Sequence, residues 1–427
     1  MKRISAVTIG AASIVALALS ACSSSSGGKD DNGGGSSTPN SAATTPALQQ
    51  PAVKFGVTGS FSGSGGAFGN PEPEVKAAAE AAVNAINQRG GIAGHEVQLV
   101  ACDDQGDPNK ASDCGRTFVS QGVVAVVGDQ SFFGSKFDPI IAKAGIPRIG
   151  PLPLQWEFTA TNDILTQGGA VAEMIGSMKH AKAAGKTSVF IMTQASAGGD
   201  AFVSILKMEA GKIGLKVKGD AALPENAADV SSYVQAAKNS GADYVLVSMS
   251  KQLSFQVFQS SQQLGAKYTV GGPAEVPNKQ MWDQLGGSSS VLNGSLLASS
   301  FPPILDDSTF PSVQQFNKEM DAESASGDKA ADTGRGTTFN TWLGFHVVDE
   351  VLKGATAVPT AASLRKAFLD AKDIDLGFGV KWTPSKKGAL IPTLSNTYGF
   401  FTTMKDGEEV LSNGDSAVDF LSDVSTN

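Results

Sequence analysis

Short apolar runs and amphipathic stretches take turns along this chain. Residues 53–58 form an apolar run that predicts a β-strand, and residues 72–88 place apolar side chains every three to four positions, as an amphipathic helix does. Residues 96–101 predict a second strand. The run 123–128 is almost entirely apolar, which is typical of a parallel strand that is covered on both faces.

The same alternation continues toward the C-terminus. Helices are expected at 171–178, 230–238 and 253–264, and strands at 188–192, 244–248 and 267–270. Asp107 and Pro108 predict the N-cap and first residue of a further helix. Such alternation predicts a doubly wound α/β fold, in which ligands bind beyond the carboxyl ends of the strands. The part of the chain after about residue 52 is too long for one hydrophobic core, so we expect two domains.

The N-terminus carries an export signal. Two basic residues precede the apolar run 4–19, which is short for a membrane-spanning helix and is followed by small residues. Residues 1–21 are therefore predicted to be a signal peptide. The segment Leu19-Ser20-Ala21-Cys22 resembles the lipobox of bacterial lipoproteins, which implies cleavage before Cys22 and lipidation of that residue. The alternative is an ordinary signal peptide in which Cys22 occurs by chance.

A low-complexity segment follows the signal. Residues 22–51 are rich in Ser, Gly, Asn, Thr and Pro and poor in apolar side chains, so they predict a disordered, flexible tether. Together with a lipid on Cys22, this segment predicts a protein that is held outside the cytoplasm, at the outer face of the cytoplasmic membrane or in the periplasm.

Composition and motifs disfavour several classes of function. The formal net charge is -8, which argues against nucleic acid as a partner. The three histidines are scattered, so no metal site is predicted, and no G-x-S-x-G nucleophile elbow occurs. The glycine-rich segment 59–70 follows a strand but lacks the G-x-G-x-x-G spacing of a dinucleotide loop, and no cofactor is expected.

Cysteine and aspartate residues gather between the second strand and the following helix. Cys102 and Cys114 are twelve positions apart, and in an exported chain they are predicted to form a disulfide. Asp103, Asp104 and Asp107 lack the spacing and the closing glutamate of a calcium loop, so helix capping and surface solvation are expected for them.

Four segments together resemble one protein family. They are residues 55–63, residues 85–94, residues 103–108 and the tripeptide Gly145-Ile146-Pro147. They are similar to the opening strand and loop, the INxxGGIxG segment, the DDxxDP turn and the approach to the fourth strand of type 1 periplasmic binding proteins, in the leucine/isoleucine/valine-binding branch. Members of this branch are extracytoplasmic receptors of ABC importers.

The resemblance implies two Rossmann-like lobes that are joined by three crossover strands, with the ligand cleft between them. By that likeness the first lobe comprises residues 52–166 and 300–378, the second comprises residues 167–299 and 379–427, and the crossovers lie near Thr166, Ser299 and Gly379. The implied function is capture of a small molecule by lobe closure and its delivery to an ABC permease, by a monomer that is not an enzyme. A sensor on the same fold and an exported hydrolase are the alternatives.

The resemblance also implies where the ligand binds, and here the sequence departs from the family. Amino-acid-binding members hold the ligand carboxylate with a serine after the third strand and a threonine after the fourth, and the ammonium group with an acidic residue of the second lobe. This chain has Phe132 and Leu154 at the first two positions and Glu275 one residue out of register at the third. The ligand is expected to contact Ser60, Phe61, Phe68, Gln130, Ser131, Phe132, Gly150, Pro151, Leu152, Thr193, Gln194, Ser248 and Glu275.

Two hypotheses for the ligand follow. A buried carboxylate needs donors, so the loss of both hydroxyls beside Phe132, Phe133 and Trp156 predicts a solute that is less zwitterionic than an amino acid, either aromatic or amphiphilic. Alternatively, the loops are shifted in register and an amino acid binds through Ser131 and backbone N–H groups.

Overall fold

The computed structural model describes residues 47–63, 71–195, 199–305, 308–332, 336–388, 390–412 and 414–422. The predicted signal peptide, Cys22, most of the predicted tether and Phe68 lie outside these residues. Residues 49–51, which the sequence assigned to the tether, belong to the first strand. Within the described ranges, no helix is both long enough and apolar enough to cross a bilayer.

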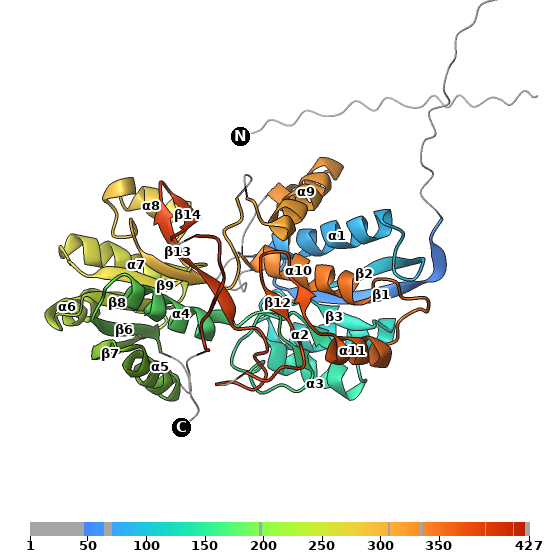
Figure 1. Cartoon of the computed structure of the whole chain (residues 1–427), viewed down its shortest axis with the longest axis horizontal. Helices are drawn as coiled ribbons and strands as arrows, with labels where there is room; N and C mark the ends of the chain where they lie inside the picture. The colour runs from blue at the N-terminus through green and yellow to red at the C-terminus, as the bar shows by residue number, and fades with distance from the viewer. Residues whose placement is uncertain are drawn as a thin grey trace, which may run out of the picture. The chain divides into compact units, whose positions relative to one another are not determined.

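The first sheet is parallel and has the strand order β2-β1-β3-β4-β5. Its strands are β1 (Gln49–Gly59), β2 (His95–Asp103), β3 (Ala125–Val127), β4 (Arg148–Ile149) and β5 (Asp163–Ile164). One face is covered by α1 (Pro73–Gln88) and α10 (Gly336–Val351), and the other by α2 (Pro108–Gln121) and α3 (Gly134–Lys143) (Figure 1). Both faces are therefore buried, as the apolar run at 123–128 predicted.

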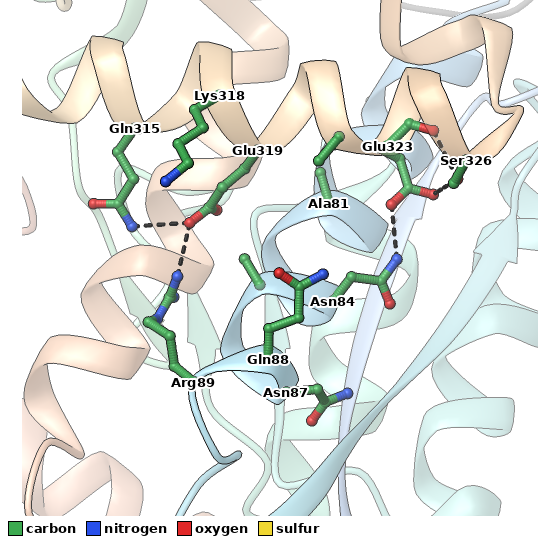
Figure 2. A pocket seen from close by; sticks show the side chains of 12 residues that line it. Ala81, Asn84, Asn87, Gln88, Arg89, Gln315, Lys318, Glu319, Glu323 and Ser326 are labelled. Atoms are coloured by element: carbon green, nitrogen blue, oxygen red, sulfur yellow. Dashed lines mark hydrogen bonds and ion pairs between the residues drawn. The ribbon is translucent and has the colours of Figure 1, made fainter. Parts of the chain in front are cut away.

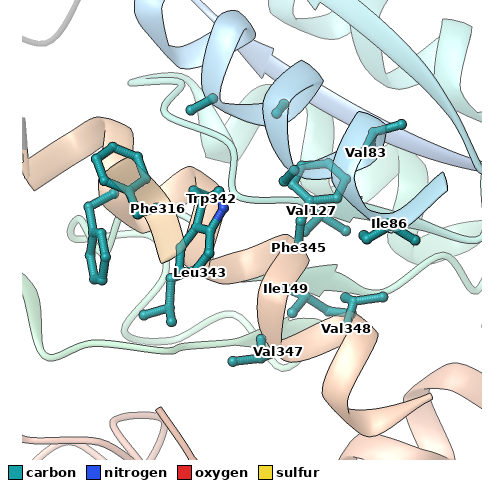
Figure 3. Close-up of a cluster of buried hydrophobic side chains, with 14 of the residues drawn as sticks. Val83, Ile86, Val127, Ile149, Phe316, Trp342, Leu343, Phe345, Val347 and Val348 are labelled. Atoms are coloured by element: carbon teal, nitrogen blue, oxygen red, sulfur yellow. The ribbon is translucent and has the colours of Figure 1, made fainter. Parts of the chain in front are cut away.

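The core of this lobe lies where α1 and α10 meet the sheet. Val83 and Ile86 of α1 share a buried cluster with Phe345 of α10 and Val127 of β3 (Figure 3). Helix α10 begins more than 180 residues after β4 ends, yet it packs directly on the carboxyl end of β3. The approach is close, because a Cβ atom on Gly128 would lie 2.6 Å from the Thr341 carbonyl oxygen.

The predicted start of α2 and the predicted disulfide are confirmed. The Asp107 carboxylate caps α2 by accepting hydrogen bonds from the backbone N–H groups of Asn109 (2.7 Å) and Lys110 (3.2 Å). Cys102 of β2 and Cys114 of α2 form a disulfide, with their Cα atoms 5.5 Å apart. The helix is thus tied to the edge of the sheet by a covalent bond as well as by packing.

The second sheet has the order β14-β13-β10-β9-β8-β6-β7, with β15 paired to β13. The strands β6 (Ser188–Gln194), β7 (Lys216–Leu223), β8 (Tyr244–Ser248), β9 (Thr269–Pro273) and β10 (Leu296–Ser299) are parallel, whereas β13 (Tyr398–Lys405), β14 (Glu408–Leu411) and β15 (Val418–Asp419) form antiparallel pairs. One face carries α4 (Gly169–Ala183) and α5 (Gly199–Ile213). The other carries α6 (Ser231–Asn239), α7 (Lys251–Gln263) and α8 (Lys279–Gln284).

Two wound α/β sheets confirm the predicted fold class. The chain passes between them after β5, after β10 and before β13. Helices α9 (Pro311–Ser326) and α11 (Ala361–Asp370) and the hairpin of β11 (Ile374–Asp375) and β12 (Lys381–Trp382) pack with the first sheet. The lobe boundaries stay a prediction. Trp382 is buried in the first core, which favours a third crossing near Asn396 rather than at Gly379.

Candidate functional site

A buried carboxylate joins the loops at the carboxyl end of the first sheet. Asp104, which follows β2, accepts hydrogen bonds from the hydroxyls of Ser60 (2.7 Å) and Ser131 (2.5 Å) and from the backbone N–H of Gly106 (2.9 Å). These donors allow Asp104 to be fully buried, so the surface solvation expected for it is wrong. The Ser131 hydroxyl also accepts a hydrogen bond from the backbone N–H of Phe133 (3.1 Å), and it is therefore committed within the protein.

The aromatic residues of these loops differ in exposure. Asp103 accepts a hydrogen bond from the backbone N–H of Phe61 (2.9 Å), and the Phe61 ring is half-buried against the first core. Phe132 is 39% exposed at the tip of the loop after β3. Trp156 is 37% exposed, and its indole N–H lies 3.2 Å from Asp138. Phe132 and Trp156 thus offer apolar surface to solvent on this side of the sheet.

Gln130 is buried beneath the same loops. Its amide nitrogen lies 3.5 Å from the hydroxyl of Thr341, which donates a hydrogen bond to the carbonyl of Gly128 (2.6 Å). Its amide oxygen is buried and has no hydrogen-bond partner in the described part of the chain. Gln130 therefore connects the loop after β3 to α10, and its amide oxygen can accept a further hydrogen bond.

The loop after β4 is held by Arg148, whose guanidinium is fully buried among carboxylates. It contacts Asp129 through Nε (2.8 Å) and Nη2 (2.6 Å), and Glu157 (2.7 Å) and Asp163 (3.2 Å) through Nη1. Burial alone would lower the pKa of Arg148, but the three carboxylates raise that pKa well above its usual value. Arg148 also lies over the ring of Phe137, 4.7 Å from its centre.

The backbone N–H groups of residues 150–154 are already hydrogen-bonded within the protein. The N–H groups of Gly150, Leu152 and Leu154 donate to Ile164 O (2.9 Å), Asp129 O (2.9 Å) and Glu157 Oε2 (3.0 Å), respectively. Pro151 and Pro153 have no N–H to donate. The carbonyl of Gly150 accepts a hydrogen bond from Asn340 (3.1 Å). Residues 150–154 therefore have no backbone N–H left for an anionic ligand.

The predicted residues of the second lobe lie at the carboxyl ends of adjacent strands. Thr193 and Gln194 end β6, and Ser248 ends β8 beside them. The Gln194 amide oxygen accepts a hydrogen bond from the backbone N–H of Ser250 (3.0 Å). Glu275 follows β9; burial raises its pKa, and the positive charge of Lys251 opposes that shift.

Glu173 of α4 is a neighbour of this group that the sequence did not predict. It is buried and accepts hydrogen bonds from the backbone N–H (3.0 Å) and hydroxyl (2.7 Å) of Ser300, just after β10. Burial and the negative charge of Glu275 raise the pKa of Glu173 well above its usual value. Glu173 is an acidic residue within the predicted helix 171–178, and the sequence pattern did not indicate that its side chain would be buried.

An apolar cavity of about 410 Å³ lies beside these loops. Pro153 and Leu154 line it from the loop after β4, and Gly199, Ala201 and Phe202 line it from the first turn of α5. Its apolar side chains come from four separate segments: Leu154, Phe158, Val171, Met174, Phe202, Ile205, Leu390 and Ile391. The described residues that line it include no charged side chain. None of the predicted contact residues that the structure describes lines this cavity.

A second hollow, of about 940 Å³, lies between α1 and α9 (Figure 2). Asn84 donates a hydrogen bond to Glu323 (2.7 Å), and Arg89 pairs with Glu319 (2.8 Å). Its polar side chains therefore bond from one helix to the other across the hollow, as Figure 2 shows. The described lining of this hollow includes no residue of the predicted ligand loops.

Each histidine has a structural partner. His95 Nδ1 lies 3.0 Å from the carbonyl of Pro51, and His180 Nδ1 lies 2.8 Å from the carbonyl of Leu297. His346 stacks on Trp342 with ring centres 4.9 Å apart. Burial lowers the pKa of His180 and of His346, which favours the neutral imidazole in both.

The protein has two α/β sheets, and the loops at the carboxyl ends of their strands supply polar and apolar groups. This arrangement defines a bilobed binding protein. The sequence profile described as "Periplasmic binding protein" matches residues 52–395. The chain belongs to this family, and its fold is that of the type 1 class.

Individual relatives are distant. The Leu/Ile/Val-binding protein homolog 3 of Brucella melitensis is 24% identical over 348 residues, which cover 79% of this chain and 88% of the relative. A fatty acid ABC transporter substrate-binding protein from Thermomonospora curvata has a TM-score of 0.69 and 18% identity, and the match covers 88% of this chain and 94% of that one. The branched-chain amino acid transporter substrate binding protein LivJ from Streptococcus pneumoniae, in complex with isoleucine, has a TM-score of 0.64 and 18% identity over 85% of this chain and 99% of that one.

Proposed function

We propose that this protein is the lipid-anchored receptor of an ABC importer, and that it captures an apolar or amphiphilic organic solute and delivers it to a permease without performing catalysis. Membership of the periplasmic binding protein family over residues 52–395 supports the receptor role. The lipobox at Cys22 supports the anchor. The cell-surface tether would keep the receptor within reach of its permease at a high effective concentration.

The single observation that carries the choice of solute is the state of the loop after β4. The family resemblance implies that donors from this region would hold the carboxylate of an amino acid, whereas here the N–H groups of Gly150, Leu152 and Leu154 are already paired. The hydroxyl of Ser131 is likewise committed to Asp104. A desolvated carboxylate without donors costs several kcal/mol, on the order of a thousand-fold in affinity. These contacts favour the less zwitterionic solute over the amino acid.

The relatives are compatible with either kind of solute. One solved structure of the same fold is named for fatty acids, and another contains isoleucine. At 18% identity these names do not show what this chain binds. The proposed solute therefore rests on the hydrogen bonds of residues 150–154 and of Ser131.

The test is to identify what the protein binds. Full-length protein is purified under mild conditions, and the bound solute is extracted and identified by mass spectrometry. Leucine, isoleucine and valine are titrated in parallel by calorimetry. We expect a solute with an apolar chain or ring, and weak or no heat from the three amino acids. Submicromolar binding of leucine would overturn the choice of solute and would restore the amino-acid hypothesis.

A further inference from the structure

The apolar cavity beside the ligand loops has the volume of a small-molecule pocket. Pockets that bind small molecules span about 300–1,000 Å³. This cavity measures about 410 Å³. Val171 and Met174 form part of its buried wall, while Phe158 and Phe202 stay half-buried at its edge. Apolar side chains left partly in water around an open space would be stabilised by an apolar occupant.

The walls of the cavity are held in place by the fold. Val171 and Met174 belong to a helix that packs against the second sheet. On the opposite side, the carbonyl of Phe158 accepts a hydrogen bond from the hydroxyl of Thr393 (2.8 Å), which ties the loop before β5 to the segment carrying Leu390 and Ile391. Three parts of the chain therefore bound the cavity. They are the loop before the first crossing between the sheets, helices α4 and α5 after that crossing, and the segment that precedes the third crossing.

The chemistry of the lining specifies the occupant. Six of its large apolar side chains are aliphatic and two are aromatic, and its polar side chains are limited to Gln155 and Thr159 among the described residues. Such a lining provides no counter-ion for a charged group. It also provides little hydrogen bonding for a substituted ring. A flexible hydrocarbon chain needs neither a counter-ion nor hydrogen-bond partners, so it can fill this space.

We propose that this cavity binds the aliphatic acyl chain of the solute, with Phe158, Met174 and Phe202 in contact with the chain. The inference rests on the proposed function, since it assigns a place to the apolar part of the captured solute. It adds a binding site made of residues outside the predicted ligand set. Because the walls come from both sides of the first crossing, the bound chain would contact both lobes at once.

Decanoate is the probe, because its hydrocarbon chain can fill the cavity while its carboxylate stays in water beside the exposed lining residues Gln155 and Thr159. Cavity-filling variants are the test. Ala170 on α4 and Ala201 on α5 line the cavity and are exposed, so Ala170→Trp and Ala201→Trp place an indole in the space without disturbing the core. Ala183→Trp is the matched control, because Ala183 is an exposed residue at the far end of α4 that does not line the cavity. Decanoate is titrated into each full-length variant by calorimetry, and circular dichroism checks the fold.

We expect decanoate to bind the unaltered protein and Ala183→Trp equally. Ala170→Trp and Ala201→Trp should each bind it at least about ten-fold more weakly, the change expected when about two methylene groups lose their burial. Equal affinity in all four proteins, or no binding of decanoate by a protein that binds its co-purified solute, would overturn the inference and leave the receptor function intact. A protein that binds neither decanoate nor any extracted solute overturns both.

Discussion

Arg148 holds both carboxylate oxygens of Asp129, through Nε at 2.8 Å and Nη2 at 2.6 Å, where neither side chain is exposed. Asp129 lies just after β3 and Arg148 begins β4. The pair therefore ties the loop after β3 to the neighbouring strand β4, which leads into the second ligand loop of the first lobe. Glu157, which also accepts from Leu154 N–H, extends this connection to the far end of the second loop.

Arg148→Met is expected to reduce the free energy of unfolding by about 3–5 kcal/mol, because it leaves carboxylates buried without their cation. Urea denaturation followed by circular dichroism measures the change. Arg116→Met is the matched control: Arg116 pairs with Asp113, but both side chains are more than half exposed, so a change below about 1 kcal/mol is expected. Equal losses in the two variants would contradict a special role for the buried pair.

Stability should also depend on pH through Asp163. Burial raises the pKa of Asp163 to about 8, although Arg148 opposes the shift. In the unfolded chain this carboxyl titrates near pH 4, as Asp does in peptides. The folded protein thus keeps a proton that the unfolded chain loses. The stabilisation from this group is full below about pH 4 and is lost as the pH rises to about 8.

Asp163→Asn removes this titration while keeping a neutral group of similar shape. Its free energy of unfolding is expected to fall less steeply between pH 4 and 8 than that of the unaltered protein, by up to about 1.4 kcal/mol per pH unit. Urea denaturation at a series of pH values measures both slopes, and Asp113→Asn serves as an exposed control. Parallel slopes for Asp163→Asn and the unaltered protein would show that the carboxyl is already ionised at neutral pH.

The disulfide should contribute substantially to the first lobe. Replacing Cys102 and Cys114 together by alanine is expected to cost about 3 kcal/mol, since the bond closes a short loop in the unfolded chain. Thermal unfolding with and without dithiothreitol gives a second measure on the unaltered protein. A melting temperature insensitive to both changes would mean that packing alone holds α2 to β2.

Ser131→Ala distinguishes a structural role for this hydroxyl from a ligand contact. Because Ser131 donates to Asp104, the variant leaves a buried carboxylate with one donor fewer and should lose about 1–3 kcal/mol of stability. Affinity for the solute identified by mass spectrometry should change less than about three-fold, an energy within the usual effect of one peripheral contact. A large loss of affinity at unchanged stability would instead place Ser131 on the ligand.

Cys22→Ala tests the anchor separately from the receptor. Without the lipid-bearing residue, the protein should move from the membrane fraction to the soluble fraction, while its affinity for the same solute stays unchanged. Cell fractionation with immunoblotting measures the first effect and calorimetry the second. Retention of Cys22→Ala in the membrane fraction would show that the lipobox assignment is wrong.

Local patterns in the sequence were sufficient for many of the elements. The period of the apolar residues placed β1, α1 and β2 within a few positions, and Asp107 and Pro108 marked the start of α2. These features depend on neighbours a few residues apart, so they can be recognised without the fold. The prediction missed β7, because it is an edge strand whose side chains alternate between exposed and half-buried and include few large apolar residues. It also missed α5, which precedes β7.

The sequence by itself determined the alternating α/β order, the family motifs and the cysteine pair that forms the disulfide. The tertiary structure decided which polar groups are buried and which apolar segments meet. Asp104 is an acidic residue in a polar turn of the sequence, but in the fold it is buried and accepts hydrogen bonds from Ser60 and Ser131. The apolar cavity combines segments near residues 154, 171, 202 and 390. Burial and convergence depend on contacts between residues far apart in the chain, and local periodicity carries no information about those contacts.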